Sequence, residues 1–362
     1  MAATPSTGIW VGTRKGAFCF RSRDRRKWDI TGPFFTGHEV HHVAQDRRDP
    51  KRLYASAGTS WFGSHLYASV DEGKTWKLSE AGLSTENKLA GAPLKRLWHI
   101  APGAADEPGV VWLGADPGVL FRSRDNGDNW EIVEGLTNHP SRSKWTEGGG
   151  GMMVHSIQPL GKGRVIVGIS AAGAFRTSDS GATWEPFNGN VRADFQPMKF
   201  PEVGQCVHKL LAHPRTPDAV FQQNHCGIYR ARFTASKWQD ISKGLPSRFG
   251  FALAVPAAEE QTVFTIPIKS SEERYVPDGK LCVARSRDGG KNWELLSKGL
   301  PQKNAYPLIL REAMSSDDHD PAGVYFGTST GAVFYTRDAG DSWQALAENL
   351  PPVYSVSVAY SG

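Results

Sequence analysis

The stretch SVDEGKTW at residues 69–76 decides the fold of this 362-residue chain, because close variants of it return four more times. The variants are SRDNGDNW (123–130), TSDSGATW (177–184), SRDGGKNW (286–293) and TRDAGDSW (336–343), and worn copies end at Trp28 and Trp238. Counting both worn copies, the seven final tryptophans follow one another at intervals of 48 to 55 residues. Such a unit has room for four short strands and their turns, which is the size of one blade of a β-propeller.

Each unit also contains two consecutive runs of β-branched and aromatic residues, such as RLYASAG (52–58) followed by HLYASVD (65–71). Such runs are typical of short strands, and no long segment has the 3.6-residue period of a helix. The repeated string is then the turn after the second run: its Asp accepts backbone N–H bonds, its Gly adopts a conformation costly for other residues, and its Trp packs between neighbouring sheets. A structural role in these turns is predicted for Asp71, Asp125, Asp179, Asp288 and Asp338.

The ends of the chain indicate how the ring closes. Only 19 residues follow Trp343, enough for the single strand YSVSVAY (354–360), while about three strands fit before Trp28. The last strand is therefore expected to complete the first blade, so that no sheet edge is left open. The prediction is one all-β domain over residues 1–362, a seven-bladed β-propeller with blades at about 354–362 plus 8–30, 38–80, 96–135, 152–190, 206–243, 249–298 and 305–348.

With five good copies over almost its whole length, the chain resembles the BNR or Asp-box repeat family. That family includes sialidases, xyloglucanases, sortilin ectodomains and photosystem II assembly factors. The resemblance implies a β-propeller whose Asp-box turns lie away from the usual binding face. Proteins with this repeat are often classed as sialidase-like or glycosyl hydrolase-like, and the resemblance implies the same class here. Sialidase activity itself is disfavoured, because no Arg-Ile-Pro motif precedes the first repeat and seven units stand where sialidases usually have six blades.

Histidines recur near the start of the innermost strands, where propellers usually bind ligands. Superposing EVHHVAQDRRDPKRLY (39–54) on the matching runs of the next three blades places four histidines at one position: His41, His99, His155 and His208. If that position faces the channel, four neutral imidazoles converge there as ligands of a divalent transition metal such as Zn, Fe, Cu or Ni. A metal-free channel lined by histidines and plain packing are the two alternatives.

The loops that enter the innermost strands, and the turns between the second and third strands, supply further candidates. A catalytic base, or a partner for a metal-bound imidazole, is expected from Glu39 or Glu147. Glu147 begins the glycine-rich stretch EGGGGMM (147–153), which lacks the GK[ST] of a phosphate loop, so no nucleotide cofactor is expected. Asp116 lies in one of the turns, and the residues predicted to bind substrate are Trp61, Arg14, Lys15, His225, Arg311 and Tyr354.

Three classes of function remain open. The first is an enzyme with a histidine-lined, metal-bearing site at the channel mouth, acting on a small molecule or a glycan. The second is a non-catalytic binding or assembly propeller that recognises a protein or a glycan. The third is a glycoside hydrolase that uses two carboxylates.

Charge, hydrophobicity and cysteine usage limit the classes of partner and the cellular compartment that we expect. The net charge is +5 and no basic block stands out, so no nucleic-acid partner is expected. No apolar run is long enough to span a membrane, so no membrane partner is expected either. The four cysteines show no CxxC spacing and the N-terminus has no signal-peptide pattern, which together predict a cytoplasmic protein with reduced thiols.

Overall fold

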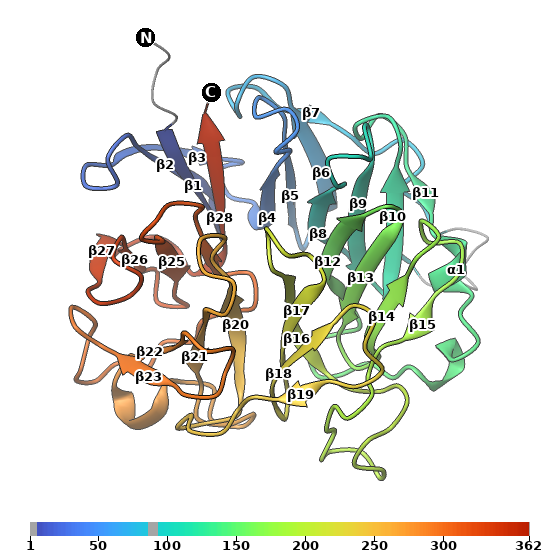
Figure 1. Ribbon diagram of the computed structural model, residues 1–362. Helices are drawn as coiled ribbons and strands as arrows, with labels where there is room; N and C mark the ends of the chain where they lie inside the picture. The colour runs from blue at the N-terminus through green and yellow to red at the C-terminus, as the bar shows by residue number, and fades with distance from the viewer. Residues whose placement is uncertain (1–5, 86–92, 362) are drawn as a thin grey trace.

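The computed structural model describes residues 6–85 and 93–361, which form an all-β ring of seven four-stranded antiparallel sheets (Figure 1). The seven-bladed β-propeller predicted from the repeats is confirmed. The helical segments of the described residues are single turns: α1 (Glu134–Thr137) and two 3-10 turns, Arg142–Lys144 and Pro277–Gly279. Residues 1–5, 86–92 and 362 of the predicted domain lie outside the described residues.

Six of the sheets are each built from four strands that follow one another in the chain, beginning with the innermost. In chain order they are β4 (Glu39–Gln45), β5 (Leu53–Thr59), β6 (Gly63–Ser69) and β7 (Lys77–Leu78); β8 (Arg96–Pro102), β9 (Val111–Asp116), β10 (Val119–Ser123) and β11 (Glu131–Ile132); β12 (Val154–Gly161), β13 (Arg164–Ile169), β14 (Gly173–Thr177) and β15 (Glu185–Pro186); β16 (Val207–Ala212), β17 (Ala219–Asn224), β18 (Gly227–Arg232) and β19 (Gln239–Asp240); β20 (Gly250–Ala254), β21 (Val263–Pro267), β22 (Val283–Ser286) and β23 (Glu294–Leu296); and β24 (Met314–Ser316), β25 (Val324–Gly327), β26 (Val333–Thr336) and β27 (Gln344–Ala347).

The first sheet joins the two ends of the chain, as the sequence predicts. Its order is β28 (Val353–Ser361), β1 (Ser6–Thr13), β2 (Gly16–Ser22) and β3 (Asp29–Phe34), with the C-terminal strand innermost (Figure 1). The register between β28 and β1 runs from Ser6 opposite Ser361 to Thr13 opposite Val353. The ring is therefore closed by backbone hydrogen bonds between the first and last strands.

The repeated turns hold their shape through one aspartate each. In the turn after β6, Asp71 Oδ1 accepts hydrogen bonds from Ser69 Oγ (2.8 Å) and from the Thr75 backbone N–H (2.9 Å), and Asp71 Oδ2 accepts one from Thr75 Oγ1 (2.6 Å). These bonds to Thr75 and Ser69 lower the pKa of Asp71 to about 2. Gly73 has a φ of +83°, and a Cβ atom there would lie 2.6 Å from Trp10 Cζ2 of the first sheet.

Several of the tryptophans that end the repeats pack against the preceding sheet. Trp76 meets Trp10 edge-on with ring centroids 5.9 Å apart, and Trp130 Nε1 donates to Ser79 O (3.0 Å). Even the worn copies keep this contact, since Trp28 packs on Tyr335 of the last sheet (5.5 Å) and Trp238 Nε1 donates to Phe187 O (2.8 Å). The repeat therefore explains blade-to-blade packing.

The innermost strands share one direction around the channel, which defines two faces. The face that carries the starts of the innermost strands and the turns between second and third strands is called the rim face here. The aspartate turns lie on the opposite face. Within residues 6–85 and 93–361, no helix is long and apolar enough to cross a membrane.

Candidate functional site

A β-bulge near the start of the innermost strands decides which side chains meet in the channel. In β4, Val40 pairs with Ala57 and His42 with Ser56, so His41 is the extra residue. In the same way His155 is the extra residue of β12 and His208 that of β16.

The predicted superposition is wrong at His99. In β8, Leu97 pairs with Ala115 and His99 with Gly114, so Trp98 occupies the bulge and His99 follows it. His99 therefore corresponds to His42, the second histidine of "VHH", rather than to His41. A one-residue slip matters because successive residues of a strand point to opposite sides.

The structure does not bring the four predicted metal ligands around one point. The ring of His41 stacks on Trp98 (4.7 Å) and Tyr354 (5.5 Å), and His155 Nε2 is hydrogen-bonded to Val207 O (2.8 Å). Among the described residues, the groups of three or more metal-ligating side chains that converge are Cys206–His208–His225 and His42–His99–Glu312. Neither group holds more than one of the predicted four.

Burial keeps the bulge histidines uncharged. Burial, with a smaller contribution from Arg96, lowers the pKa of His41 to about 4. Burial also lowers the pKa of His155 and of His208 well below the usual range, and Arg311 adds to both shifts. The same layer includes Trp98 and Tyr354, which stack on His41, and Phe251, which stacks on His208, so most of its side chains are aromatic.

A buried charged centre lies directly below that aromatic layer. Glu312 Oε2 accepts from Lys209 Nζ (2.5 Å) and from His99 Nδ1 (3.2 Å), and the ring of His42 stacks on His99 (4.5 Å). Burial alone would raise the pKa of Glu312, but Lys209 and His99 hold it well below its usual range. Glu312 Oε1 and Ser355 Oγ are buried without a hydrogen-bond partner in the described part of the chain.

The hydrogen bonds of this centre argue against a metal between its two histidines. The Ile100 backbone N–H donates to His42 Nδ1 (3.1 Å), so the proton of the neutral ring sits on Nε2. Neither nitrogen of His42 then has a free lone pair for a metal. The centre instead borders a channel cavity of about 270 Å³ whose lining includes His42, Lys209, Glu312, Gln158 and Met314.

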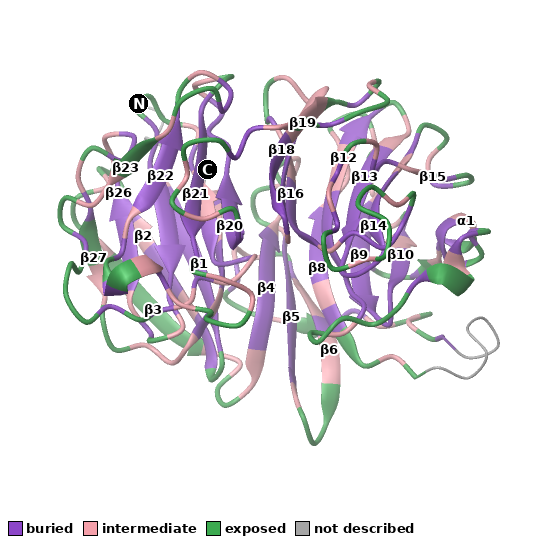
Figure 2. Cartoon of the chain, turned by 90° about the horizontal axis from the view of Figure 1, so that it is seen from below, coloured by how far each residue is buried: buried purple, intermediate pink, exposed green. Residues whose placement is uncertain are grey.

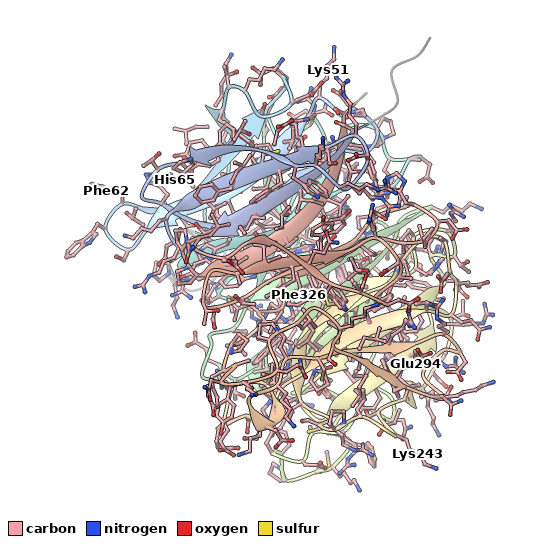
Figure 3. All side chains as sticks on the ribbon, turned by 90° about the vertical axis from the view of Figure 1, so that its left-hand side faces the viewer. Lys51, Phe62, His65, Lys243, Glu294 and Phe326 are labelled. Carbon is pink, nitrogen blue, oxygen red and sulfur yellow. The ribbon has the colours of Figure 1, made fainter. Side chains whose placement is uncertain are left out.

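The rim face carries large exposed apolar side chains. Trp61 and Phe62, on the turn between β5 and β6, are 89% and 78% exposed. That turn projects from the molecule as an exposed tip in Figure 2, and Figure 3 shows Phe62 standing clear of its neighbours. Other exposed apolar residues lie in the loops that lead into β16 and β24: Phe195, Met198, Phe200 and Tyr306.

The predicted catalytic and binding residues surround this face in separate groups. Glu39 Oε1 lies 3.9 Å from Arg14 Nε, and Glu39 Oε2 lies 3.9 Å from His41 Nε2. Lys15 follows Arg14 and is exposed on the same turn between β1 and β2.

Glu147, the other predicted base, forms an ion pair with Lys95 (2.9 Å). Arg311 donates to Ser170 Oγ (2.9 Å), and the ring of His225 lies 4.9 Å from that of Phe195. Glu39 lies near Arg14 and His41, whereas Glu147 pairs with Lys95, so the two predicted bases belong to separate groups.

A buried carboxylate that the sequence marked only as a turn residue lies beside the pair of Lys95 and Glu147. Burial and the charge of Glu147 raise the pKa of Asp116 against the opposing effect of Lys95, and Asp116 Oδ1 is buried without a hydrogen-bond partner in the described residues. Gly151 has a φ of +91°, and a Cβ atom there would lie 2.8 Å from Asp116 Oδ2. The glycine-rich loop thus allows backbone to approach this carboxylate closely.

The comparisons with known proteins agree with the fold. No family model matches the chain. An oligoxyloglucan-reducing end-specific xyloglucanase of Emericella nidulans is 25% identical over 317 residues, which is 76% of this chain and 37% of the relative. The photosystem II assembly lipoprotein Ycf48 of Synechococcus sp. is 24% identical over 245 residues, covering 64% of this chain and 57% of the relative. The chain spans between 26% and 37% of the length of the curated xyloglucanases it matches.

Two solved structures show the same architecture. The GH74 xyloglucanase from Xanthomonas campestris superposes with a TM-score of 0.64 at 19% identity, covering 93% of this chain and 52% of that one. A YCF48 structure bound to a D1 peptide gives a TM-score of 0.53 at 15% identity, covering 84% of this chain and 80% of that one. The homologues are thus xyloglucanases and Ycf48, and both kinds are β-propellers.

Proposed function

We propose that this chain is a glycan-binding propeller that holds a polysaccharide against its rim face, with Trp61 as a stacking platform. The observation that carries the proposal is the exposure of Trp61 and Phe62 on one projecting turn. An indole in that position costs free energy in water unless a ligand covers it, and its flat face matches the C–H face of a pyranose ring.

The surroundings of Trp61 favour a glycan over an apolar peptide. The rim face also presents Arg14, Lys15, Glu39 and the ion pair of Lys95 with Glu147, which offer donors and acceptors for sugar hydroxyls. Several of the relatives are xyloglucanases by name, so xyloglucan is the first ligand to test.

Trp61→Ala is expected to weaken binding of soluble xyloglucan by about two- to tenfold. Stacking on one aromatic ring is worth about 0.5–1.5 kcal/mol, and 1.4 kcal/mol is a factor of ten. Affinity electrophoresis in gels with and without xyloglucan measures the change. Trp61→Tyr should keep part of the affinity, and the matched control Ile30→Ala removes an apolar side chain of β3 that is 53% exposed. Equal retardation of wild type and Trp61→Ala would contradict the proposal, as would capture of an extended peptide without any glycan.

Asp116 supports a second candidate function, cleavage of the bound glycan by two carboxylates. A carboxyl whose pKa is raised can keep its proton and give it to a leaving oxygen, while an exposed carboxylate activates water. Asp116 has the raised pKa, and Glu147, held by Lys95, has the exposed carboxylate. In this second proposal Asp116 is the acid and Glu147 the base.

The hydrolysis proposal predicts slow release of reducing ends from xyloglucan by the wild-type protein. Glu147→Gln and Asp116→Asn should each lower that rate at least a hundredfold, because general acid–base catalysis contributes about 10²–10⁴-fold. Asp318→Asn changes an exposed carboxylate on the opposite face, where it pairs with Arg47 (2.6 Å), and as the control it should leave the rate within about twofold. If wild-type protein releases no reducing ends while binding xyloglucan, the chain is a binding propeller without this activity.

A further inference from the structure

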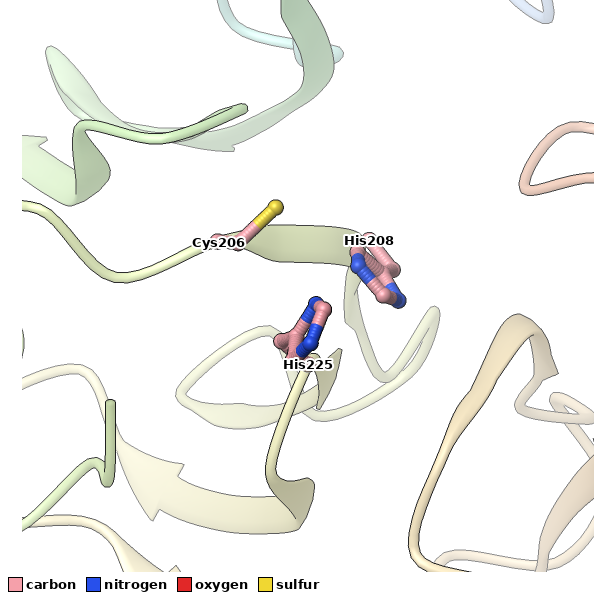
Figure 4. Close-up of side chains that lie close together, drawn as sticks. All are labelled: Cys206, His208 and His225. Atoms are coloured by element: carbon pink, nitrogen blue, oxygen red, sulfur yellow. The ribbon is translucent and has the colours of Figure 1, made fainter. Parts of the chain in front are cut away.

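We infer that Cys206, His208 and His225 form a zinc site at the rim end of the fifth sheet. The three side chains come from the start of β16 and from the turn between β17 and β18, so the sheet itself brings them together. Figure 4 shows the three side chains lying close together. The inference is independent of glycan binding.

The donor atoms are close enough to share one ion. Each residue offers one ligand atom, and these atoms all lie within 4.8 Å of one another. Zinc bonds of about 2.0–2.3 Å place two tetrahedral ligands about 3.5 Å apart. Small side-chain rotations therefore bring the three donors to bonding distance.

Main-chain hydrogen bonds already fix part of this cluster. His208 Nδ1 is 2.6 Å from Gly250 O, so it donates its N–H there and the other ring nitrogen carries the lone pair. Metal-ligating histidines commonly donate their second N–H to a carbonyl in this way. The His225 backbone N–H donates to Cys206 O (3.0 Å), which holds the two residues opposite each other.

Aromatic side chains pack against both imidazoles. The ring of His208 packs on Phe251 (4.5 Å) and Phe249 (5.2 Å), and that of His225 packs on Phe195 (4.9 Å) and Phe249 (5.1 Å). The His225 ring makes no hydrogen bond within the described part of the chain. His225 is half-buried, so an ion can reach this ring from the rim face.

The donor types and their exposure select the ion and the kind of site. One thiolate and two imidazoles suit a borderline-soft ion such as Zn²⁺ rather than Mg²⁺ or Ca²⁺. Cys206 and His225 are half-buried while His208 is buried, so the cluster opens toward the rim face. Three protein ligands with one open side leave the fourth position for water or another ligand.

The test is metal binding by the full chain, produced without a His-tag. Equilibrium dialysis against Zn²⁺ with elemental analysis should give one zinc ion per chain. Titration with Co²⁺ as a spectroscopic probe should give a thiolate-to-cobalt charge-transfer band. Cys206→Ser should abolish that band and lower the Zn²⁺ affinity at least tenfold, and His225→Ala should also lower that affinity. The matched control Cys282→Ser removes another half-buried free thiol, from the sixth sheet, and should bind as wild type does.

Both test residues are half-buried, so the variants are expected to fold, and circular dichroism with thermal unfolding checks this. His208 is left unchanged, because its ring packs between Phe249 and Phe251. A wild-type chain that binds no stoichiometric zinc overturns the inference. A Co²⁺ charge-transfer band that survives Cys206→Ser overturns it as well, since the thiolate would then come from another cysteine.

Discussion

A chain that ends at Pro352 is expected to lose its cooperative unfolding transition, because the ring can no longer close. The missing strand, β28, pairs with β1 along the whole length of β1 and buries Val353 and Val356 almost completely. Burial of one such side chain contributes about 1.5–3 kcal/mol, and an unpaired β1 would also expose its backbone groups. The total approaches the 5–15 kcal/mol that stabilises a typical protein.

Adding the missing strand back as a peptide distinguishes the loss of ring closure from misfolding of the rest of the chain. A synthetic peptide of residues 350–362, supplied in excess, should restore the near-ultraviolet circular dichroism and the thermal transition of the truncated chain. Ser357→Pro in the full chain is the companion variant, because Ser357 sits opposite Trp10 in the ladder and proline removes a backbone donor. A truncated chain that unfolds cooperatively at the wild-type temperature would contradict closure by β28.

Glu312→Gln is expected to lower the free energy of unfolding by about 3–5 kcal/mol, because it leaves the ammonium group of Lys209 buried without a counter-charge. Glu312 is 3% exposed and Lys209 is 5% exposed, so water screens this pair little. Urea unfolding at neutral pH measures the loss. The double variant Glu312→Gln with Lys209→Met removes both charges and should recover much of the stability.

The pH dependence of this loss follows from the pKa of Glu312. Lys209 and His99 hold this pKa well below the usual value of 4.5, so the ionised carboxylate contributes stability above pH 4.5. The contribution disappears as the pH falls through the folded-state pKa, and the gap between wild type and Glu312→Gln should therefore narrow below about pH 4.5. Asp318→Asn, which breaks the exposed pair with Arg47, is the control and should cost less than about 1 kcal/mol. If Glu312→Gln also lowered the free energy of unfolding by less than about 1 kcal/mol, the prediction would be contradicted, because water would then already screen the charges of Lys209 and Glu312.

Most of the fold was predictable because the repeat encodes it several times. The tryptophan spacing predicts seven units, and several of these tryptophans do pack on the preceding sheet, as Trp76 does on Trp10. Closure by residues 354–360 followed from counting the strands that fit before Trp28 and after Trp343. These predictions depend on local turn sequences and on chain length, and contacts between distant residues change neither of them.

The site was less predictable because small backbone irregularities decide it. The bulge in β8 falls on Trp98, and no feature of the sequence distinguishes a bulge at Trp98 from one at His99. The buried pair of Lys209 and Glu312 joins strands 103 residues apart in the chain, and no spacing rule connects them. The nearness of Cys206 to His208 could have been read from the i, i+2 spacing within one strand, but the contribution of His225 depends on the neighbouring turn.

The central claim, that a glycan lies on the rim face, is tested most directly by hydrogen–deuterium exchange with and without xyloglucan oligosaccharides. Slower exchange is predicted in the rim segments 59–63, 143–151 and 192–204, with no change in the aspartate turns 70–75 and 178–183 on the opposite face. Protection confined to the strand ends that line the channel cavity, 211–214 and 314–316, would contradict the claim and place the ligand in the channel instead.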